Sequence, residues 1–265
     1  MGTALSHFHT SAALVEALSF GAAHADVEVK LVPTPFADTP LTLVPGDEVF
    51  PAERSELACR AANVVIASIA LVVMVPVLAL IALAVRLTSR GPVFYSQIRV
   101  GVDRRFHRKS TYDRRGKDLG GLPFRMFKFR TMRVDAEADG KAVWAQKRDP
   151  RTTVVGKFLR KYRLDEVPQL WNVIRGDMNI VGPRPERPTI FAELREEIPL
   201  YAQRQRVRPG ITGWAQINQS YDSCLSDVKN KVRLDLEYVG RQSLAHDMMI
   251  MSLTLPVMLF RKGGW

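Results

Sequence analysis

A long uncharged apolar run is the feature that most restricts how this chain can fold. From Asn63 to Val85 the sequence has no charged side chain, and the run is as long as the roughly 20 residues that a helix needs to cross a bilayer core. A buried helix of a soluble protein normally carries a polar stripe. We therefore expect a membrane-inserted helix within residues 53–90.

Pro76 lies in the middle of this run. A proline inside a helix removes one backbone hydrogen bond and clashes with the preceding turn, so we expect a kink. Arginines flank the run on both sides: Arg54, Arg60, Arg86, Arg90 and Arg99. This charge pattern gives no inside–outside asymmetry. A spanning helix and a re-entrant helix both remain open, and the two basic flanks favour re-entry.

Composition narrows the class of partner. The chain has a formal net charge of +11 and a sequence pI near 9.9, which implies nucleic acid, an anionic membrane surface or a phosphorylated substrate. Its cysteines, Cys59 and Cys224, are far apart and form no CxxC pair, so neither a disulfide framework nor a zinc site is indicated. A reducing, cytoplasm-facing setting fits best.

The rest of the chain divides around the apolar run. Residues 1–52, rich in Ala, Thr and Pro, are expected to form a variable, mobile extension without a cleaved signal. Residues 91–265 should form one catalytic domain, with a charged surface loop at 103–122. The Met- and Leu-rich stretch at 247–262 resembles an interfacial helix, and burial in the core is the alternative.

A strand pattern occurs before the carboxylates. In the run Phe127–Met132 apolar side chains alternate with the cations Lys128 and Arg130. In a strand, Phe127 and Phe129 would then pack inward while both cations face the other way. A phosphate-binding face and a plain solvated face explain this pattern equally well.

Asp165 and Glu166 are the strongest chemical signal. Pro168 follows them, and proline is tolerated in the first turn of a helix, so the pair should lie at or next to a helix amino terminus that ends near Gly176. An ionised aspartate there is a candidate nucleophile, and adjacent carboxylates suit Mg²⁺. Helix capping is the simpler alternative.

Two further motifs are rich in Pro and Gly. Gly182-Pro183-Arg184-Pro185 fixes the backbone on both sides of one arginine, whose guanidinium could bind phosphate oxygens in a forked geometry. The stretch from Arg208 to Gln216 contains a Pro-Gly turn that could form a pocket wall. Each has a rigid surface turn as its structural alternative.

Five motifs occur in order: Gly91–Phe94, Lys128–Met132, Leu164–Gln169 with Gly176–Met178, Gly182–Pro185 and Arg208–Gln216. With them the chain, from about residue 55 to its end, resembles the monotopic polyprenyl-phosphate phosphoglycosyl transferases, the bacterial sugar transferase family. The resemblance implies an α/β fold, helix-rich with short strands, a kinked re-entrant membrane helix, and a catalytic domain with interfacial amphipathic helices. In this chain the break is Val75-Pro76 where the family has Ser-Pro, and the loop at 103–122 is longer than expected.

The same resemblance implies the reaction. A sugar-1-phosphate would pass from a UDP-sugar to a polyprenyl phosphate such as undecaprenyl phosphate, with release of UMP. This step initiates assembly of exopolysaccharide, capsule, O-antigen or glycoprotein glycans. It would take place at the bacterial inner membrane, with the catalytic domain among membrane lipids on the cytoplasmic face.

The resemblance also assigns roles to residues. Asp165 would attack the β-phosphorus and form a covalent phosphosugar intermediate, and Asp165 and Glu166 would hold Mg²⁺. Four cations would bind substrate phosphates: Arg160, Arg184, Lys128 and Arg130. Four residues are assigned to the nucleotide-sugar pocket: Pro183, Pro185, Gln216 and Asp235.

Two other functions remain as alternatives. A membrane-bound Mg²⁺-dependent UDP-sugar phosphohydrolase would use the same groups with water as acceptor. A non-catalytic basic membrane scaffold would explain the charge but not the carboxylate pair. The sequence has no recognisable nucleic-acid-binding module. It leaves open which sugar is transferred and whether the protein is a homodimer.

Overall fold

The computed structural model describes residues 48–103, 120–134, 136, 149–219 and 224–260. Its elements follow one another as α2 (Glu56–Thr88), β1 (Phe94–Val100), β2 (Pro123–Phe129), α3 (Val154–Lys161), η1 (Leu164–Glu166), α4 (Gln169–Arg175), β3 (Asn179–Val181), α5 (Pro188–Glu197), η2 (Tyr201–Arg206), β4 (Gly210–Thr212), α6 (Trp214–Asn218), α7 (Leu225–Arg241) and α8 (Leu244–Phe260). The expected helix-rich fold with short strands is confirmed. Most of the extension and of the loop at 103–122 lies outside the described residues.

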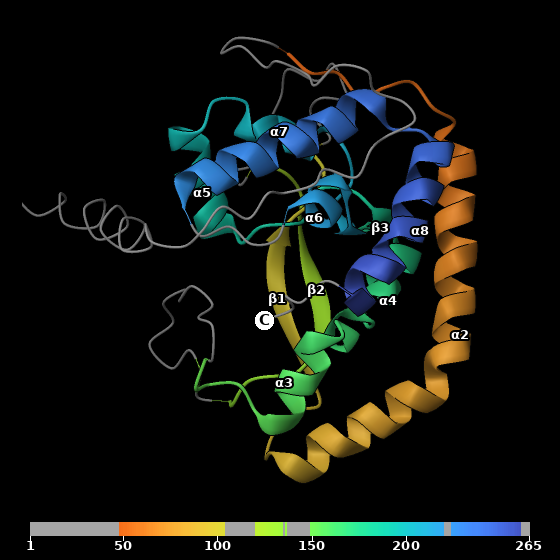
Figure 1. Cartoon of the computed structure of the whole chain (residues 1–265), viewed down its shortest axis with the longest axis vertical. Coiled ribbons are helices and arrows are strands. Elements are labelled where there is room, and N and C mark those ends of the chain that lie inside the picture. Colours follow the sequence, from red (N-terminus) through yellow and green to blue (C-terminus); the bar gives the residue numbers. More distant parts are fainter. Residues whose placement is uncertain (1–47, 104–119, 135, 137–148, 220–223, 261–265) are drawn as a thin grey trace, which may run out of the picture.

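The apolar run forms α2, a single helix of 33 residues with Pro76 inside it. Ser55 caps its start by accepting a hydrogen bond from the amide of Ala58. Figure 1 shows α2 bent into two arms, and we assign the bend to the hydrogen bond that Pro76 cannot make. Only 11% of its most apolar 18-residue window is buried. The helix therefore has the length and exposed apolar surface of a membrane helix, not of a soluble core helix.

The amino-terminal arm of α2 is bound to the rest of the protein by polar side chains. Arg60 donates to the carbonyls of Val173 and Ile174 at the end of α4, where the last carbonyls of a helix lack partners. Asn63 accepts a hydrogen bond of 2.6 Å from the amide of Ile180 in β3. These contacts fix this arm against α4 and β3.

The other end of α2 is bound to the same body. The guanidinium of Arg130, just after β2, donates to the carbonyls of Ser89 and Arg90 at 2.7 and 2.9 Å. Between the two ends, Ile81 and Val85 pack with Phe129 and with Leu159 of α3. Both arms of α2 therefore lie on one body, as Figure 1 shows.

Two small sheets form the frame of the body. β1 and β2 pair antiparallel, with Phe94 opposite Phe129 and Tyr95 opposite Lys128. β3 and β4 pair parallel, with Asn179 opposite Gly210. Regular strand–helix alternation is absent from the described part of the chain.

The main core lies around α7, which packs against α6 and η2, and its buried cluster extends to Val181 of β3 and Ile250 of α8. Within it Tyr238 donates to Asp247 at 2.7 Å, and Asp247 forms an ion pair with Arg54 at 3.1 Å. Helix α8 is mixed in character, because Ile250 is fully buried whereas Leu255 is 65% exposed. Core packing therefore explains the first half of α8, and its interfacial character stays a prediction.

Candidate active site

The two carboxylates lie in η1, directly before α4. Arg163 precedes them with a left-handed backbone (φ 52°), and Pro168 separates η1 from α4, so the chain turns sharply on both sides of the pair. Asp165 and Glu166 are 8% and 6% exposed. The predicted boundary is confirmed in outline: the pair lies next to the helix amino terminus, outside its first turn. Gly176, with φ 89°, ends the helix as predicted.

Glu166 is surrounded by cations from three parts of the chain. Lys128 of β2 donates to Oε1 at 2.8 Å, and Arg184 donates to Oε1 at 2.5 Å and to Oε2 at 3.3 Å. Arg163 forms a longer ion pair at 3.8 Å. The structure thus brings together Lys128, Glu166 and Arg184, three of the predicted site residues.

Asp165 and Glu166 differ in their electrostatics. Burial would raise the pKa of Glu166, but the charges of Arg184 and Lys128 outweigh burial and lower the pKa well below its usual value. Burial raises the pKa of Asp165, and the charges of Lys128, Arg160 and Arg184 only partly offset this. Adjacent carboxylates whose pKa values are shifted in opposite directions are typical of sites where two acids have different roles.

Asp165 is also the carboxylate with free oxygens. Within the described residues it accepts no hydrogen bond and forms no ion pair, whereas both oxygens of Glu166 accept from cations. One carboxylate is therefore a structural counter-charge and the other is available to react or to bind a ligand.

A buried asparagine connects α4 to β2. Asn172 is fully buried; its Oδ1 accepts from the amide of Phe127 at 3.1 Å, and its Nδ2 donates to the carbonyl of Arg125 at 2.7 Å and to Asp177 at 3.1 Å. This side chain pairs with the backbone of β2, the strand that carries Lys128, and so links that strand to α4. We did not single it out from the sequence, although an asparagine inside a helix is a weak signal of such a role.

The other predicted phosphate ligands have different positions. Arg160, in the last turn of α3, donates to the hydroxyl of Thr152 at 3.3 Å and adds positive potential at Asp165. Arg130 is 5% exposed, and the hydrogen bonds that it forms go to the end of α2. It does not join the group around Glu166, because the strand ends at Phe129 and the alternation does not continue.

The residues assigned to the nucleotide-sugar pocket lie mostly inside the protein. Pro183 and Pro185 are buried and flank Arg184. Gln216 is half-buried and donates to the carbonyl of Ile211 at 3.0 Å. Asp235 is 2% exposed and pairs with Arg204, which is 0% exposed. Asp235 therefore lies behind the site, in the core.

The described ranges contain no group of three or more His, Cys, Asp or Glu side chains placed to share a metal ion. Asp165 nevertheless suits Mg²⁺, which takes one or two carboxylates and completes its shell with water and phosphate oxygens. Glu166 already accepts three hydrogen bonds from Lys128 and Arg184, so less of its acceptor capacity is left for a metal ion than at Asp165. The donor set thus fits a magnesium ion held by Asp165 and substrate.

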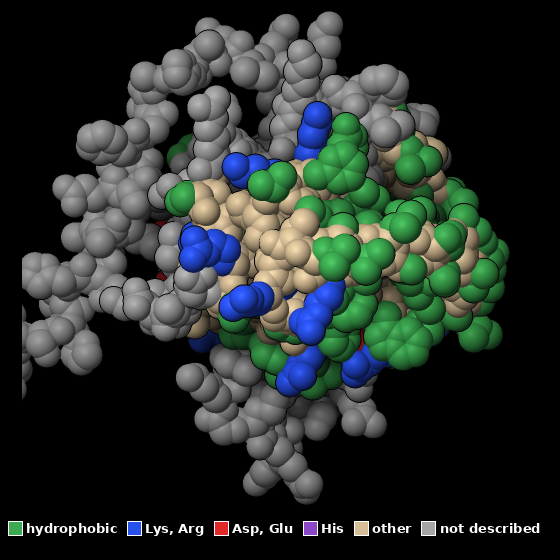
Figure 2. Space-filling view, turned by 90° about the horizontal axis from the view of Figure 1, so that it is seen from below, with side chains coloured by type: hydrophobic (Ala, Val, Ile, Leu, Met, Phe, Trp, Pro, Cys, Tyr) green, Lys and Arg blue, Asp and Glu red, His purple; other side chains and the backbone are tan. Residues whose placement is uncertain are grey.

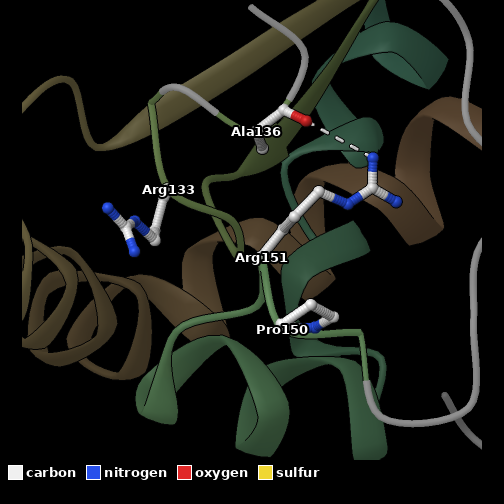
Figure 3. Close-up of a pocket in the computed structure, with 4 residues that line it drawn as sticks. All are labelled: Arg133, Ala136, Pro150 and Arg151. Carbon is white, nitrogen blue, oxygen red and sulfur yellow. Dashed lines mark hydrogen bonds between the residues drawn. The ribbon is translucent and has the colours of Figure 1, made fainter.

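An open hollow of about 200 Å³ occurs elsewhere, lined by Arg133, Ala136, Pro150 and Arg151. In Figure 3 the side chain of Arg151 extends toward the carbonyl of Ala136, and Arg133 points away from it. Arg151 also pairs with Asp149. None of the predicted site residues lines this hollow, so we do not connect it with the carboxylates.

Comparison with known proteins gives consistent matches. The family model for bacterial sugar transferases matches residues 54–261. The chain is 40% identical over 223 residues to the UDP-glucose:undecaprenyl-phosphate glucose-1-phosphate transferase of Escherichia coli, which covers 83% of this chain and 42% of that protein. A protein of the same name from Caulobacter vibrioides is 37% identical over 83% of this chain and 76% of its own length.

A relative with a different sugar in its name is about as similar. The UDP-N-acetylgalactosamine-undecaprenyl-phosphate N-acetylgalactosaminephosphotransferase of Aeromonas hydrophila is 38% identical over 77% of this chain and 44% of that protein. The chain thus spans about two fifths of the length of the Escherichia coli and Aeromonas relatives.

Proposed function

The chain belongs to the bacterial sugar transferase family, and on that premise we propose that it transfers a sugar-1-phosphate from a UDP-sugar to undecaprenyl phosphate and releases UMP. One observation carries the proposal: beside a carboxylate that cations engage at both oxygens, Asp165 keeps its oxygens free. The names of the relatives support both substrates. The product would begin assembly of a polysaccharide.

The reaction proceeds by two displacements at one phosphorus. A carboxylate oxygen of Asp165 attacks the β-phosphorus of the UDP-sugar, and the bond from that phosphorus to the bridging oxygen breaks, so UMP leaves with the electron pair. An oxygen of the lipid phosphate then attacks the phosphorus of the aspartyl-phosphosugar. The bond to Asp165 breaks and regenerates the carboxylate, and the product is a polyprenyl diphosphate sugar.

The surrounding charges make this attack feasible. A carboxylate that approaches a diphosphate meets like-charge repulsion, which fixed cations offset. Lys128 and Arg184 are held next to Asp165 by Glu166, so their charge is in place before substrate arrives. Arg160 adds to the same field. We assign Glu166 the role of a permanently ionised counter-charge.

Asp165 would hold Mg²⁺ together with substrate oxygens, and the bound ion would supply further neutralisation of the diphosphate. Burial raises the pKa of Asp165, and the charges of Lys128, Arg160 and Arg184 oppose this shift, so the cations favour the ionised carboxylate that the attack requires.

We also propose that α2 re-enters the membrane on one side. A spanning helix would carry its ends to opposite faces, whereas Asn63 and Ser89, near the two ends of α2, contact the same body. Figure 2 shows hydrophobic side chains gathered on one side of the lower face and Lys and Arg beside them, with almost no acidic side chain in view. Such a surface suits insertion into one anionic leaflet. Cysteine accessibility that places positions 54 and 90 on opposite faces would exclude re-entry.

The transfer is tested with the purified full chain in detergent micelles, Mg²⁺, and either UDP-glucose or UDP-N-acetylgalactosamine. UMP release that requires undecaprenyl phosphate and yields a lipid-linked sugar is the expected result. UMP release without lipid acceptor would favour the phosphohydrolase. Absence of UMP from both sugars and from a wider UDP-sugar panel would favour the scaffold.

A further inference from the structure

The segment that carries Arg184 is held at every one of its carbonyls. The run Pro183–Glu186 contains two prolines, which lack an amide hydrogen, so its carbonyls are the main backbone groups by which it can be fixed. Four donors reach the four consecutive carbonyls, in order: the amide of Gly210 at 3.0 Å, Nη2 of Arg204 at 3.1 Å, Nη1 of Arg99 at 3.1 Å and the amide of Val100 at 2.9 Å.

Two of these donors are buried guanidinium groups with their own counter-charges. Arg204 is 0% exposed and pairs with Asp235 through Nε at 2.7 Å. Arg99 lies near Glu186 at 3.9 Å, and Lys231 donates to the same carboxylate at 3.0 Å. A buried charge is expensive unless it is paired, so the carboxylates make it possible to place guanidinium groups behind this segment.

Arg204 cannot touch substrate directly, because no part of its side chain reaches the surface. Its Nη2 atom donates to the carbonyl of Arg184, whose own side chain reaches Glu166. A continuous chain of contacts therefore runs from Asp235 through Arg204 and Arg184 to Glu166. The guanidinium of Arg204 is also held over the ring of Tyr201 at 4.9 Å, which limits its freedom further.

We propose that Arg204, fixed by Asp235, is a positioning residue that sets Arg184 on Glu166 and on the substrate phosphates. The inference deepens the proposed function and rests on it. It gives Asp235 a role behind the site instead of in the nucleotide-sugar pocket. Arg99 acts in the same way on the next carbonyl.

The kinetic constants give a readout that a merely structural role would not move. The guanidinium of Arg184 reaches Glu166, and its backbone carbonyl accepts from Arg204. If Arg184 loosens, a group proposed to bind the substrate phosphates is misplaced, so KM for the UDP-sugar should rise and kcat should fall in the folded fraction. A change that only lowers stability should leave both constants of the folded fraction unchanged.

The test is a double-mutant cycle of Arg204→Lys and Arg184→Ala, measured as lipid-dependent UMP release from UDP-glucose or UDP-N-acetylgalactosamine by the full chain. Lysine keeps the charge for Asp235 but lacks the planar fork that also reaches the Arg184 carbonyl. We expect kcat to fall about tenfold to a hundredfold in Arg204→Lys, as small misplacements of binding groups cause, with KM for the UDP-sugar raised. The double variant should be no slower than Arg184→Ala alone.

Val239→Ala is the matched control, because Val239 is fully buried in the same helix as Asp235. It should lower thermal stability without changing KM or kcat of the folded fraction. If Arg204→Lys does not fold, Asp235→Asn takes its place in the cycle, since it keeps the shape of the side chain and weakens the hold on Arg204.

The outcomes separate this inference from the function beneath it. If Arg184→Ala is slow and the effects of the two substitutions multiply, or if KM and kcat keep their wild-type values in Arg204→Lys, the positioning role is overturned and the transferase stands. If Arg184→Ala retains full activity, the proposed role of Arg184 fails and this inference falls with it.

Discussion

Replacement of Asn172 by alanine should weaken the connection between β2, which carries Lys128, and α4, which follows the two carboxylates. The variant loses three side-chain hydrogen bonds, to Phe127, Arg125 and Asp177, each worth about 1 kcal/mol net. It also leaves the amide of Phe127 and the carbonyl of Arg125 unpaired in a partly buried setting, which adds about 1 kcal/mol. The better helix propensity of alanine returns about 0.6 kcal/mol. We expect a net loss of about 3 kcal/mol in the free energy of unfolding.

The loss is measured by chemical denaturation in mild detergent, followed by tryptophan fluorescence. Asn230→Ala is the matched control, since Asn230 is exposed on α7, and surface changes stay within about 0.5 kcal/mol. Asn172→Asp should be worse than alanine at neutral pH, because it places a buried carboxylate beside Asp177, and it should recover as pH falls. A loss below about 1 kcal/mol in Asn172→Ala would refute the view that this side chain connects β2 to α4.

Three further predictions follow from the site and its frame. Asp165→Asn should lower turnover at least about 10³-fold. It should not lower stability at neutral pH, because burial raises the pKa of this carboxyl and a neutral side chain there removes the free-energy cost of burying a charge. Near-normal turnover would exclude a covalent intermediate. Glu186→Gln should cost about 3 kcal/mol near neutrality. Burial opposes ionisation of Glu186, but Lys231, Arg204 and Arg99 outweigh it and lower its pKa from 4.5 to about 2. The stability that this group contributes is therefore complete above about pH 5 and is lost as the pH falls toward about 2. The free energies of unfolding of wild type and variant, measured by denaturation, should converge over that pH range. Arg130→Met should destabilise the protein by about 2–4 kcal/mol and leave KM for the UDP-sugar unchanged in the folded fraction; a raised KM would restore a substrate role.

Local patterns predicted the parts of the fold that local physics decides. An uncharged apolar run fixes a helix by its length, and Pro76 disrupts it wherever it lies. Pro168 and Gly176 mark the limits of α4 because their backbone preferences hold in any context. The alternation around Lys128 likewise predicted a strand, and the strand is present as far as Phe129.

Tertiary contacts decided the rest. Arg130 carries the same charge as Lys128, but the strand ends between them and the carbonyls of α2 lie within its reach. No local pattern indicates that Arg204, in a polar run, is fully buried. The hold on Pro183–Glu186 draws on β1, η2 and β4, which are far apart in sequence, so a one-dimensional pattern could not reveal it.

Because α2 is attached at both of its ends, its two faces should tolerate different kinds of substitution. Toward the body, Ala67 is 0% exposed and Asn63 is 7% exposed. A larger residue at position 67 would therefore push α2 away from α4 and expose the last carbonyls of α4. Toward the outside, Val72 and Leu80 are 72% and 67% exposed, and any apolar side chain would serve there. Along this helix, positions that accept only residues of matching shape should alternate, with the period of the helix, with positions that accept any apolar residue.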